Sequence, residues 1–270
     1  MQLPNEIWLY ILTYLDIKAV NKVRTLSHYF LGLVEDESFL KTFCNNLKIP
    51  LLCKQNTTTI LTDYKPDHKS WLWFFKAYHY KKNSTIGRRE YGQGIYYGEW
   101  LDNRPHGYGI YDTKNTIYIG QWNNGTYHEG TTIYNDGDKF IGKYKNQLRS
   151  EGIYYFIQGD IYIGEWQNGK FHGYGIYKWS DGRKYIGNWI NENEHGFGIL
   201  KFPDGHKYIG QWIKAKRHGF GKLKYKNKTL YKGHWENDHP ITGNLPWDNF
   251  CNISFVERRK LISEKFPKNK

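Results

Sequence analysis

One motif recurs along most of the chain: an aromatic residue, any residue, a glycine, any residue and a second aromatic residue. Successive copies begin 22 or 23 residues apart. The first residues of the seven copies are Tyr96, Tyr118, Phe140, Tyr162, Tyr185, Tyr208 and Tyr231. A fixed period of this length is typical of repeat proteins, in which each unit buries apolar surface against the next.

Each copy continues with a second glycine-containing segment, which predicts a β-hairpin. In the fourth unit an Asn-Gly pair at residues 168–169 favours a type I′ turn, because both central positions require positive φ. Folding about this turn pairs Gly164 with Gly173. It also pairs Tyr162 with Gly175 on the same face. The glycines leave gaps in which rings of the same or a neighbouring hairpin can lie, so stacked hairpins should bury the rings.

These features resemble the MORN repeat, whose pattern is Tyr-x-Gly-x-Trp followed by Gly-x-Gly and Asp-Gly at about this period. The resemblance covers residues 91–240. It implies an elongated antiparallel ribbon of hairpins that presents a binding surface. The second and third units depart from the pattern, because His128 and Ser150 stand where the first glycine of the second segment belongs. We expect the ribbon to be irregular at these two units.

The N-terminal segment has the period of helices instead. Apolar residues between Ile7 and Leu15 recur at helical spacing, and Pro4 stands at a plausible first turn. The order of these residues resembles the F-box. That resemblance implies a surface for the Skp-family linker of an SCF-type ubiquitin ligase, formed or supported by Leu3, Pro4, Ile7, Ile11, Leu12, Leu15, Val20 and Val23. The alternative is that these residues form only an internal core, although a domain this small hides apolar surface poorly.

The expected fold class is therefore α+β by segment, with a small N-terminal helical domain followed by an antiparallel β-hairpin array. We place the F-box-like domain at residues 1–48 and the seven MORN repeats at 91–240. Residues 49–90 are expected to form a helical extension and a linker, with helices around 38–44 and 70–80 and the linker at 81–90. Residues 241–270 form a tail. The combination is similar to that of F-box and MORN proteins from large DNA viruses.

A basic stretch near the end of the array is the one candidate ligand site. Residues 214–232 contain eight basic residues and no acidic residue. A patch for an acidic ligand would comprise Lys214, Lys216, Arg217, Lys222, Lys224, Lys226 and Lys228. Strand alternation would place the last four lysines on one face. The patch either blocks association between sheet edges, as lysine does well, or binds phospholipid headgroups or an acidic partner.

No catalytic, metal or cofactor site is expected, and the chain does not read as an enzyme. Four His-Gly pairs occur, but each lies on its own hairpin, and a stacked row cannot converge as zinc ligands must. Three widely spaced cysteines favour a reducing, cytoplasmic setting, and no apolar run is long enough to span a membrane. The charge of +13 is spread along the chain. Nucleic-acid binding is therefore a weaker hypothesis, because the rings already have a packing role.

The leading hypothesis is a substrate adaptor of an SCF-type ubiquitin ligase, in which the F-box binds the Skp-family linker and the MORN repeats bind a protein target. The alternative is a non-enzymatic scaffold, peripheral at membranes, whose ribbon binds acidic phospholipid or self-associates.

Overall fold

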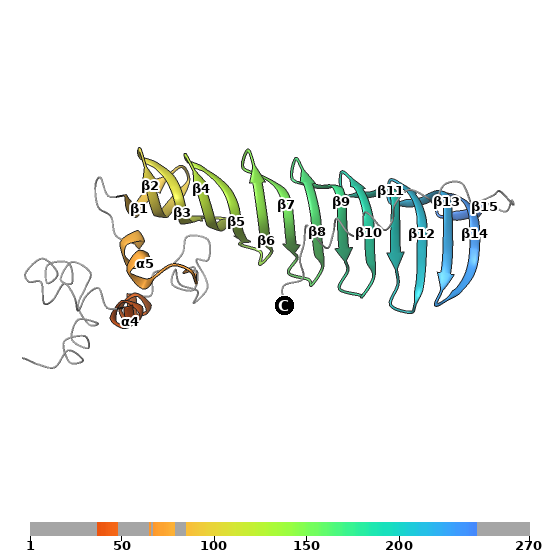
Figure 1. The fold of residues 1–270 in the computed structure, drawn as a ribbon, viewed down its shortest axis with the longest axis horizontal. Helices are drawn as coiled ribbons and strands as arrows, with labels where there is room; N and C mark the ends of the chain where they lie inside the picture. Colours follow the sequence, from red (N-terminus) through yellow and green to blue (C-terminus); the bar gives the residue numbers. More distant parts are fainter. Residues whose placement is uncertain (1–36, 48–64, 66, 79–84, 242–270) are drawn as a thin grey trace, which may run out of the picture. The chain divides into compact units, whose positions relative to one another are not determined.

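The computed structural model describes residues 37–47, 65, 67–78 and 85–241. They divide into two compact units that meet in the sequence between Ile157 and Gln158, and each unit is built mainly of antiparallel strands (Figure 1). The eight residues expected to bind the Skp-family linker lie outside the described residues, as does the tail from residue 242 onward. The predicted F-box therefore stays a prediction.

The described residues of the first unit form two helices and seven strands. These are α4 (Glu37–Leu47), α5 (Trp71–Tyr78), β1 (Ile86–Tyr91), β2 (Gly94–Leu101), β3 (Arg104–Thr113), β4 (Thr116–Asn123), β5 (Thr126–Tyr134), β6 (Lys139–Lys145) and β7 (Leu148–Tyr155). Consecutive strands pair antiparallel throughout the unit. The helices expected around 38–44 and 70–80 are confirmed as elements. The linker expected at 81–90 is wrong in its second half, because Ile86–Tyr91 forms β1 and pairs with β2 along its full length.

The part of the second unit up to residue 241, which the structure describes, forms eight strands. These are β8 (Ile161–Gln167), β9 (Lys170–Lys178), β10 (Lys184–Ile190), β11 (Asn193–Lys201), β12 (His206–Ile213), β13 (Lys216–Tyr225), β14 (Lys228–Glu236) and β15 (His239–Ile241). They pair antiparallel in sequence order. Each of the seven sequence copies therefore forms one hairpin, and β1 precedes the first of them.

The hairpin turns adopt the conformation that the Asn-Gly pair predicts. Asn168 has φ of 52° and Gly169 has φ of 78°. The other hairpin turns also hold residues with positive φ, most of them not glycine: Asp102, Asn103, Asn124, Gly125, Asn146, Gln147, Asn191, Glu192, Lys214, Ala215, Asn237 and Asp238. The twist of these turns matches the twist of the flanking strands. The stabilisation from this match outweighs the conformational cost of the left-handed backbone at these positions.

The register of the fourth hairpin corrects the pairing expected from the sequence. Gly164 pairs with Gly175 rather than with Gly173, and Tyr162 pairs with Tyr177. The difference arises from a bulge, since Glu165 still pairs with His172. Gly173 lies within this bulge at φ of 61°, a conformation that favours glycine. Simple counting from the turn cannot anticipate two extra residues on one strand.

The second and third hairpins have a smaller bulge, which confirms the irregularity expected there. Gln121 pairs with Glu129 and Trp122 pairs with Tyr127, so that only His128 is left over. Ser150 occupies the corresponding place in the third hairpin. Neither His128 nor Ser150 has positive φ. A bulge of one residue does not require the left-handed conformation, and glycine is accordingly absent from both positions.

The core of each unit is a row of aromatic rings on one face of the sheet. In the second unit, Tyr162, Tyr185 and Tyr208 each pack edge to face against the tryptophan of their own hairpin and that of the next, and Tyr231 packs against Trp235 of its own hairpin. The centroids of neighbouring rings lie 5.0 to 5.7 Å apart. In order, the row is Trp166, Tyr162, Trp189, Tyr185, Trp212, Tyr208, Trp235 and Tyr231. The expectation that stacked hairpins bury the rings is confirmed.

Candidate functional site

On the face of the sheet that carries the row of aromatic rings, the rings pack against the backbone and against one another. The Tyr208 ring lies over the paired glycines of its hairpin, so closely that a Cβ atom on Gly221 would stand 2.2 Å from the Tyr208 hydroxyl oxygen. The hydroxyl donates a hydrogen bond of 3.0 Å to the carbonyl of Gln211, beside the bulge. Burial raises the pKa of Tyr208 and of the equivalent Tyr162, so both remain neutral donors. The motif rings thus serve packing, and the opposite face of the sheet is called the outer face.

An isoleucine ladder runs across the outer face of the second unit. Its members pair directly from strand to strand between β8 and β12: Ile163, Ile176, Ile186, Ile199 and Ile209. Ile199 is buried and the other four are half-buried. The next two strands continue the row with Lys222 and Lys232. The ladder is thus an apolar stripe that ends in two cations.

A lysine ladder runs beside the isoleucine ladder, two residues further along each strand. Its members lie directly opposite one another on five consecutive strands: Lys178, Lys184, Lys201, Lys207 and Lys224. Lys178 and Lys201 are exposed and the other three are half-buried. Alternation places both ladders on the same face, separated by roughly 7 Å along the strands.

Only part of the basic patch expected from the sequence lies together. Lys222 and Lys224 share the outer face of β13. Lys226 instead occupies a turn at φ of 50°, and Lys228 pairs with Tyr225, whose side chain alternates to the other face. The prediction that four consecutive alternate lysines share one face is therefore wrong, because β13 ends before Lys226. Lys214 and Lys216 lie at the far end of the hairpin, at its turn.

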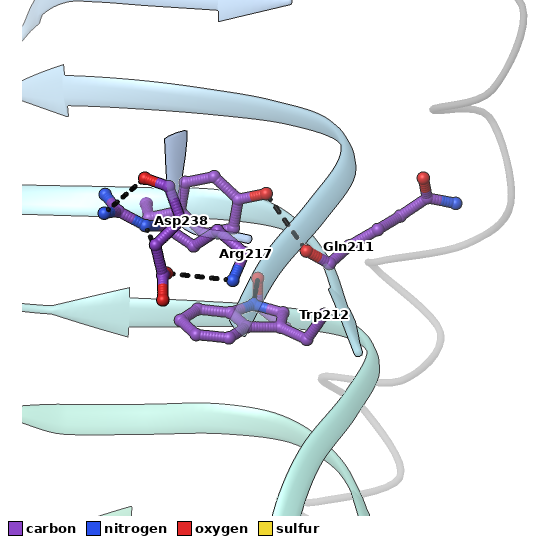
Figure 2. Close-up of polar contacts among 6 residues, drawn as sticks. Gln211, Trp212, Arg217 and Asp238 are labelled. Carbon is purple, nitrogen blue, oxygen red and sulfur yellow. Dashed lines mark hydrogen bonds and ion pairs between the residues drawn. The ribbon is translucent and has the colours of Figure 1, made fainter. Parts of the chain in front are cut away.

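Arg217, another residue of the expected patch, is bound to neighbours within the sheet (Figure 2). Its backbone N–H and its Nε each donate to the Asp238 carboxylate at 3.0 Å, and a guanidinium nitrogen donates to the Asp238 carbonyl at 3.0 Å. The guanidinium also lies 4.5 Å from the centre of the Trp235 ring. Arg217 thus ties the β12–β13 hairpin to the turn of the next one.

Sequence reasoning missed four members of the lysine ladder: Lys178, Lys184, Lys201 and Lys207. A signal for them was present. Lys184 and Lys207 directly precede the motif tyrosines, while Lys178, Lys201 and Lys224 each stand three residues after the second glycine of the Gly-x-Gly segment. The stretch at 214–232 drew attention because its charges are close in the sequence, whereas the ladder assembles charges that are far apart in the sequence.

A third row of side chains borders the isoleucine ladder on its other side. It includes Tyr174, Phe197 and Phe220, which alternate with the polar residues Asn188 and Gln211. Within the stretches that the structure describes, no three His, Cys, Asp or Glu residues gather as a metal site would require. The outer face of the second unit is thus a mixed basic, apolar and aromatic surface suited to recognition.

In the first unit, the corresponding face is covered by a helix of the chain itself. Tyr97 and Ile110 begin the equivalent ladder and are 3% and 0% exposed. Tyr78 of α5 stacks on Tyr97 with ring centroids 6.3 Å apart. Trp73 of the same helix donates its indole N–H to Glu99 at 3.0 Å and packs edge-on against Tyr108.

The fold and its outer face define a β-hairpin repeat protein with a recognition surface. The model of the MORN repeat family matches residues 96–115, 118–139, 162–182, 185–207 and 208–229, so the chain contains five MORN repeats. The hairpins that begin at Phe140 and Tyr231 lie outside these matches but have the same pairing. A comparison with curated proteins gave no significant match. Neither helix of the described part is long and apolar enough to cross a bilayer.

Proposed function

We propose that the chain is a non-catalytic adaptor in which residues 1–48 dock on the Skp-family linker of an SCF-type ubiquitin ligase and the MORN array binds a protein target. The proposal rests on one observation: the two faces of the sheet have different roles. The rings and glycines of the repeats are used in packing, while the outer face of the second unit presents side chains to a partner.

The attachment of the helices to the array supports the adaptor role. The Lys69 ammonium forms an ion pair of 2.8 Å with Glu99, and Trp73 shares the same carboxylate. The backbone N–H of Trp71 donates to Glu37, which joins α4 to α5. A helical segment held against the first hairpin would keep a docked ligase at a set distance from a target, and such proximity is the catalytic contribution of an adaptor. This role implies the cytoplasm. Viral origin stays a prediction from the resemblance.

Co-purification with the Skp-family linker tests the proposal. Wild-type chain should retain the linker, and the double variant Leu3→Ala/Pro4→Ala should lose it. Asn5→Ala provides the matched control, because residue 5 is the variable position of the Leu-Pro-x-Glu opening. Equal recovery with wild type and the double variant, or no recovery with either, would contradict the adaptor role.

The second candidate is a scaffold that binds acidic phospholipid through its basic residues. The observation in its favour is the run of lysines opposite one another on β9–β13. Sedimentation of the full chain with vesicles of neutral lipid, with and without about 30% anionic lipid, separates the two candidates. Binding to the anionic vesicles alone, with no linker recovered, would favour the scaffold.

A further inference from the structure

The lysine ladder is costly to the fold that carries it. Like charges directly opposite each other on paired strands repel, and here this occurs at four successive strand pairs. Three ion pairs of the second unit join residues outside the ladder: Arg183 with Asp181, His206 with Asp204 and Arg217 with Asp238. Among the described residues, no carboxylate pairs with Lys178, Lys201, Lys207 or Lys224. A row of this kind is better explained by an acidic partner than by stability.

The ladder does not protect a sheet edge. Lysine discourages association between sheets when it stands on an edge strand. All five lysines lie on β9 to β13, each of which pairs with a neighbour on both sides. The repulsion is therefore placed in the interior of the unit, where edge protection has no use.

The isoleucine ladder makes a purely ionic ligand a poor fit. It lies about 7 Å from the lysine row and offers five aliphatic side chains with no hydrogen-bond donor. A single-stranded nucleic acid would place its sugars or bases over this stripe without polar contacts. A ligand that matches both rows needs an apolar stripe with acidic groups along one flank, and an amphipathic helix has this pattern.

The molecule already seats a helix on the equivalent face of its first unit. α5 stacks Tyr78 on Tyr97, which corresponds to an isoleucine rung, and contacts Tyr108 in the neighbouring row through Trp73. The dimensions also agree. Five strands span about 19 Å, the length of an α-helix of roughly 13 residues, and one helical turn of about 5.4 Å is close to the strand spacing of about 4.8 Å.

We propose that the lysine and isoleucine ladders on the outer face of β8–β13 bind an acidic amphipathic helix of a partner protein. The helix lies across the strands, with its apolar stripe on the isoleucines and carboxylates at successive turns facing the lysines. The inference rests on the proposed role of the array in binding a protein target. The chain's own tail, residues 242–270, is a poor occupant, because it carries six basic and three acidic residues.

The test measures binding of a fluorescent helical peptide of about 14 residues to the full-length chain by anisotropy. The peptide carries leucine along one stripe and glutamate along the adjoining flank, and a second peptide has lysine in place of each glutamate. Wild type should bind only the acidic peptide. Lys201→Glu/Lys207→Glu should weaken that binding about tenfold or more. The matched control is Lys170→Glu/Lys214→Glu, whose residues lie at the hairpin turns far from the ladder. This variant should bind the acidic peptide as tightly as wild type does.

Three results would overturn the proposal. The first is equal affinity of the two double variants for the acidic peptide. The second is binding of anionic vesicles but not of the peptide, which would assign the face to lipid. The third is displacement of the peptide by single-stranded RNA at equal or lower concentration. Recovery of the Skp-family linker by Lys201→Glu/Lys207→Glu is measured in parallel, so that a failure of the F-box proposal is distinguished from a failure at this surface.

Discussion

At the scale of single residues, the repeat depends on a tyrosine that crosses a pair of glycines. In the hairpin of β12 and β13, Gly210 pairs with Gly221, and the Tyr208 ring lies over both. The absence of two Cβ atoms lets the hydroxyl reach the carbonyl of Gln211 next to the bulge, where ladder pairing is interrupted. The hydroxyls of Tyr118, Tyr162, Tyr185 and Tyr231 make the same hydrogen bond to the carbonyl three residues on, whereas Phe140 has no hydroxyl. This recurrence explains why tyrosine and glycine appear together in the motif.

Gly221→Ala should destabilise the second unit by about 2–3 kcal/mol, because the new methyl group would meet the rigid, buried Tyr208 ring. Thermal and denaturant unfolding measure the effect. Gly169→Asn is the control, since nothing lies within 4 Å of a Cβ at that position and asparagine tolerates the φ of 78°. A loss of stability no greater than that of the control would refute this account of the motif.

Asp160 links two hairpins and makes stability depend on pH. Its carboxylate accepts a hydrogen bond of 2.7 Å from the Tyr177 hydroxyl and one of 2.8 Å from the N–H of Ser180. Partial burial alone would raise the pKa of Asp160, but these hydrogen bonds outweigh it and hold the pKa below its usual value. A depressed folded-state pKa stabilises the protein above the unfolded-state value of about 4, and this contribution is lost as pH falls through the folded-state value.

Asp160→Asn should therefore lower the stability at pH 7 by about 1 kcal/mol, and the difference from wild type should shrink as the pH falls below about 4. Unfolding midpoints measured between pH 7 and pH 3 check the prediction, with Glu192→Gln at an exposed turn as the control. A difference that stays constant over this range would show that the charge of Asp160 is not what matters.

At the scale of elements, each hairpin combines a tight turn, a bulge and two strands whose faces differ in character. The bulge brings a side chain of the facing strand over the exposed backbone: the Gln211 amide oxygen accepts a hydrogen bond of 2.9 Å from the N–H of Phe220. One face then carries the rings and the other carries the ladders. The repulsion along the lysine ladder is a property of this element and predicts a gain in stability when charge is removed.

Lys201→Gln/Lys207→Gln should raise the free energy of unfolding by about 1 kcal/mol, because it removes three like-charged pairs between adjacent strands. Thermal unfolding at low salt measures the gain, which should largely disappear at about 1 M salt, where the charges are screened. Lys170→Gln/Lys214→Gln is the matched control. A decrease in stability would mean that the ladder supports the fold rather than a partner.

At the scale of the whole molecule, the chain forms two compact units. Both are built from the same repeat, but their outer faces have different roles. The first unit buries the start of its outer face under α5, whereas the second presents its ladders to a partner. Glu99 is central to the first arrangement, since one carboxylate oxygen accepts hydrogen bonds from both Lys69 and Trp73. The helix begins at Trp71 because Ser70 caps it, its hydroxyl accepting from the N–H of Trp73.

Glu99→Ala should release α5 without unfolding the strands. Hydrogen exchange in Trp71–Tyr78 should become about tenfold faster, while exchange in β8–β14 stays unchanged. Glu165→Ala, at the same position of the fourth repeat, is the control. Unchanged exchange in α5 would show that the ring contacts alone hold the helix on the sheet.

The sequence by itself determined the number, order and hairpin form of the repeats, because rings, glycines and turn residues act within one unit and recur with its period. It also indicated helices at the places of α4 and α5. Strand β1 was not apparent, since Ile86–Tyr91 lacks the motif and becomes a strand only because β2 offers an unpaired edge. The exact register also escaped prediction, since the bulge shifts Gly175 into the place expected for Gly173.

Only the tertiary structure decided the candidate site. Lys178 and Lys224 are 46 positions apart in the sequence, yet pairing across five strands places them in one row. In contrast, Lys222 and Lys228 are close in the sequence but lie on different faces, because β13 ends in a turn between them. Local residue types fix local conformation, whereas a surface is built from register between strands, and register follows from bulges and packing that no single repeat contains.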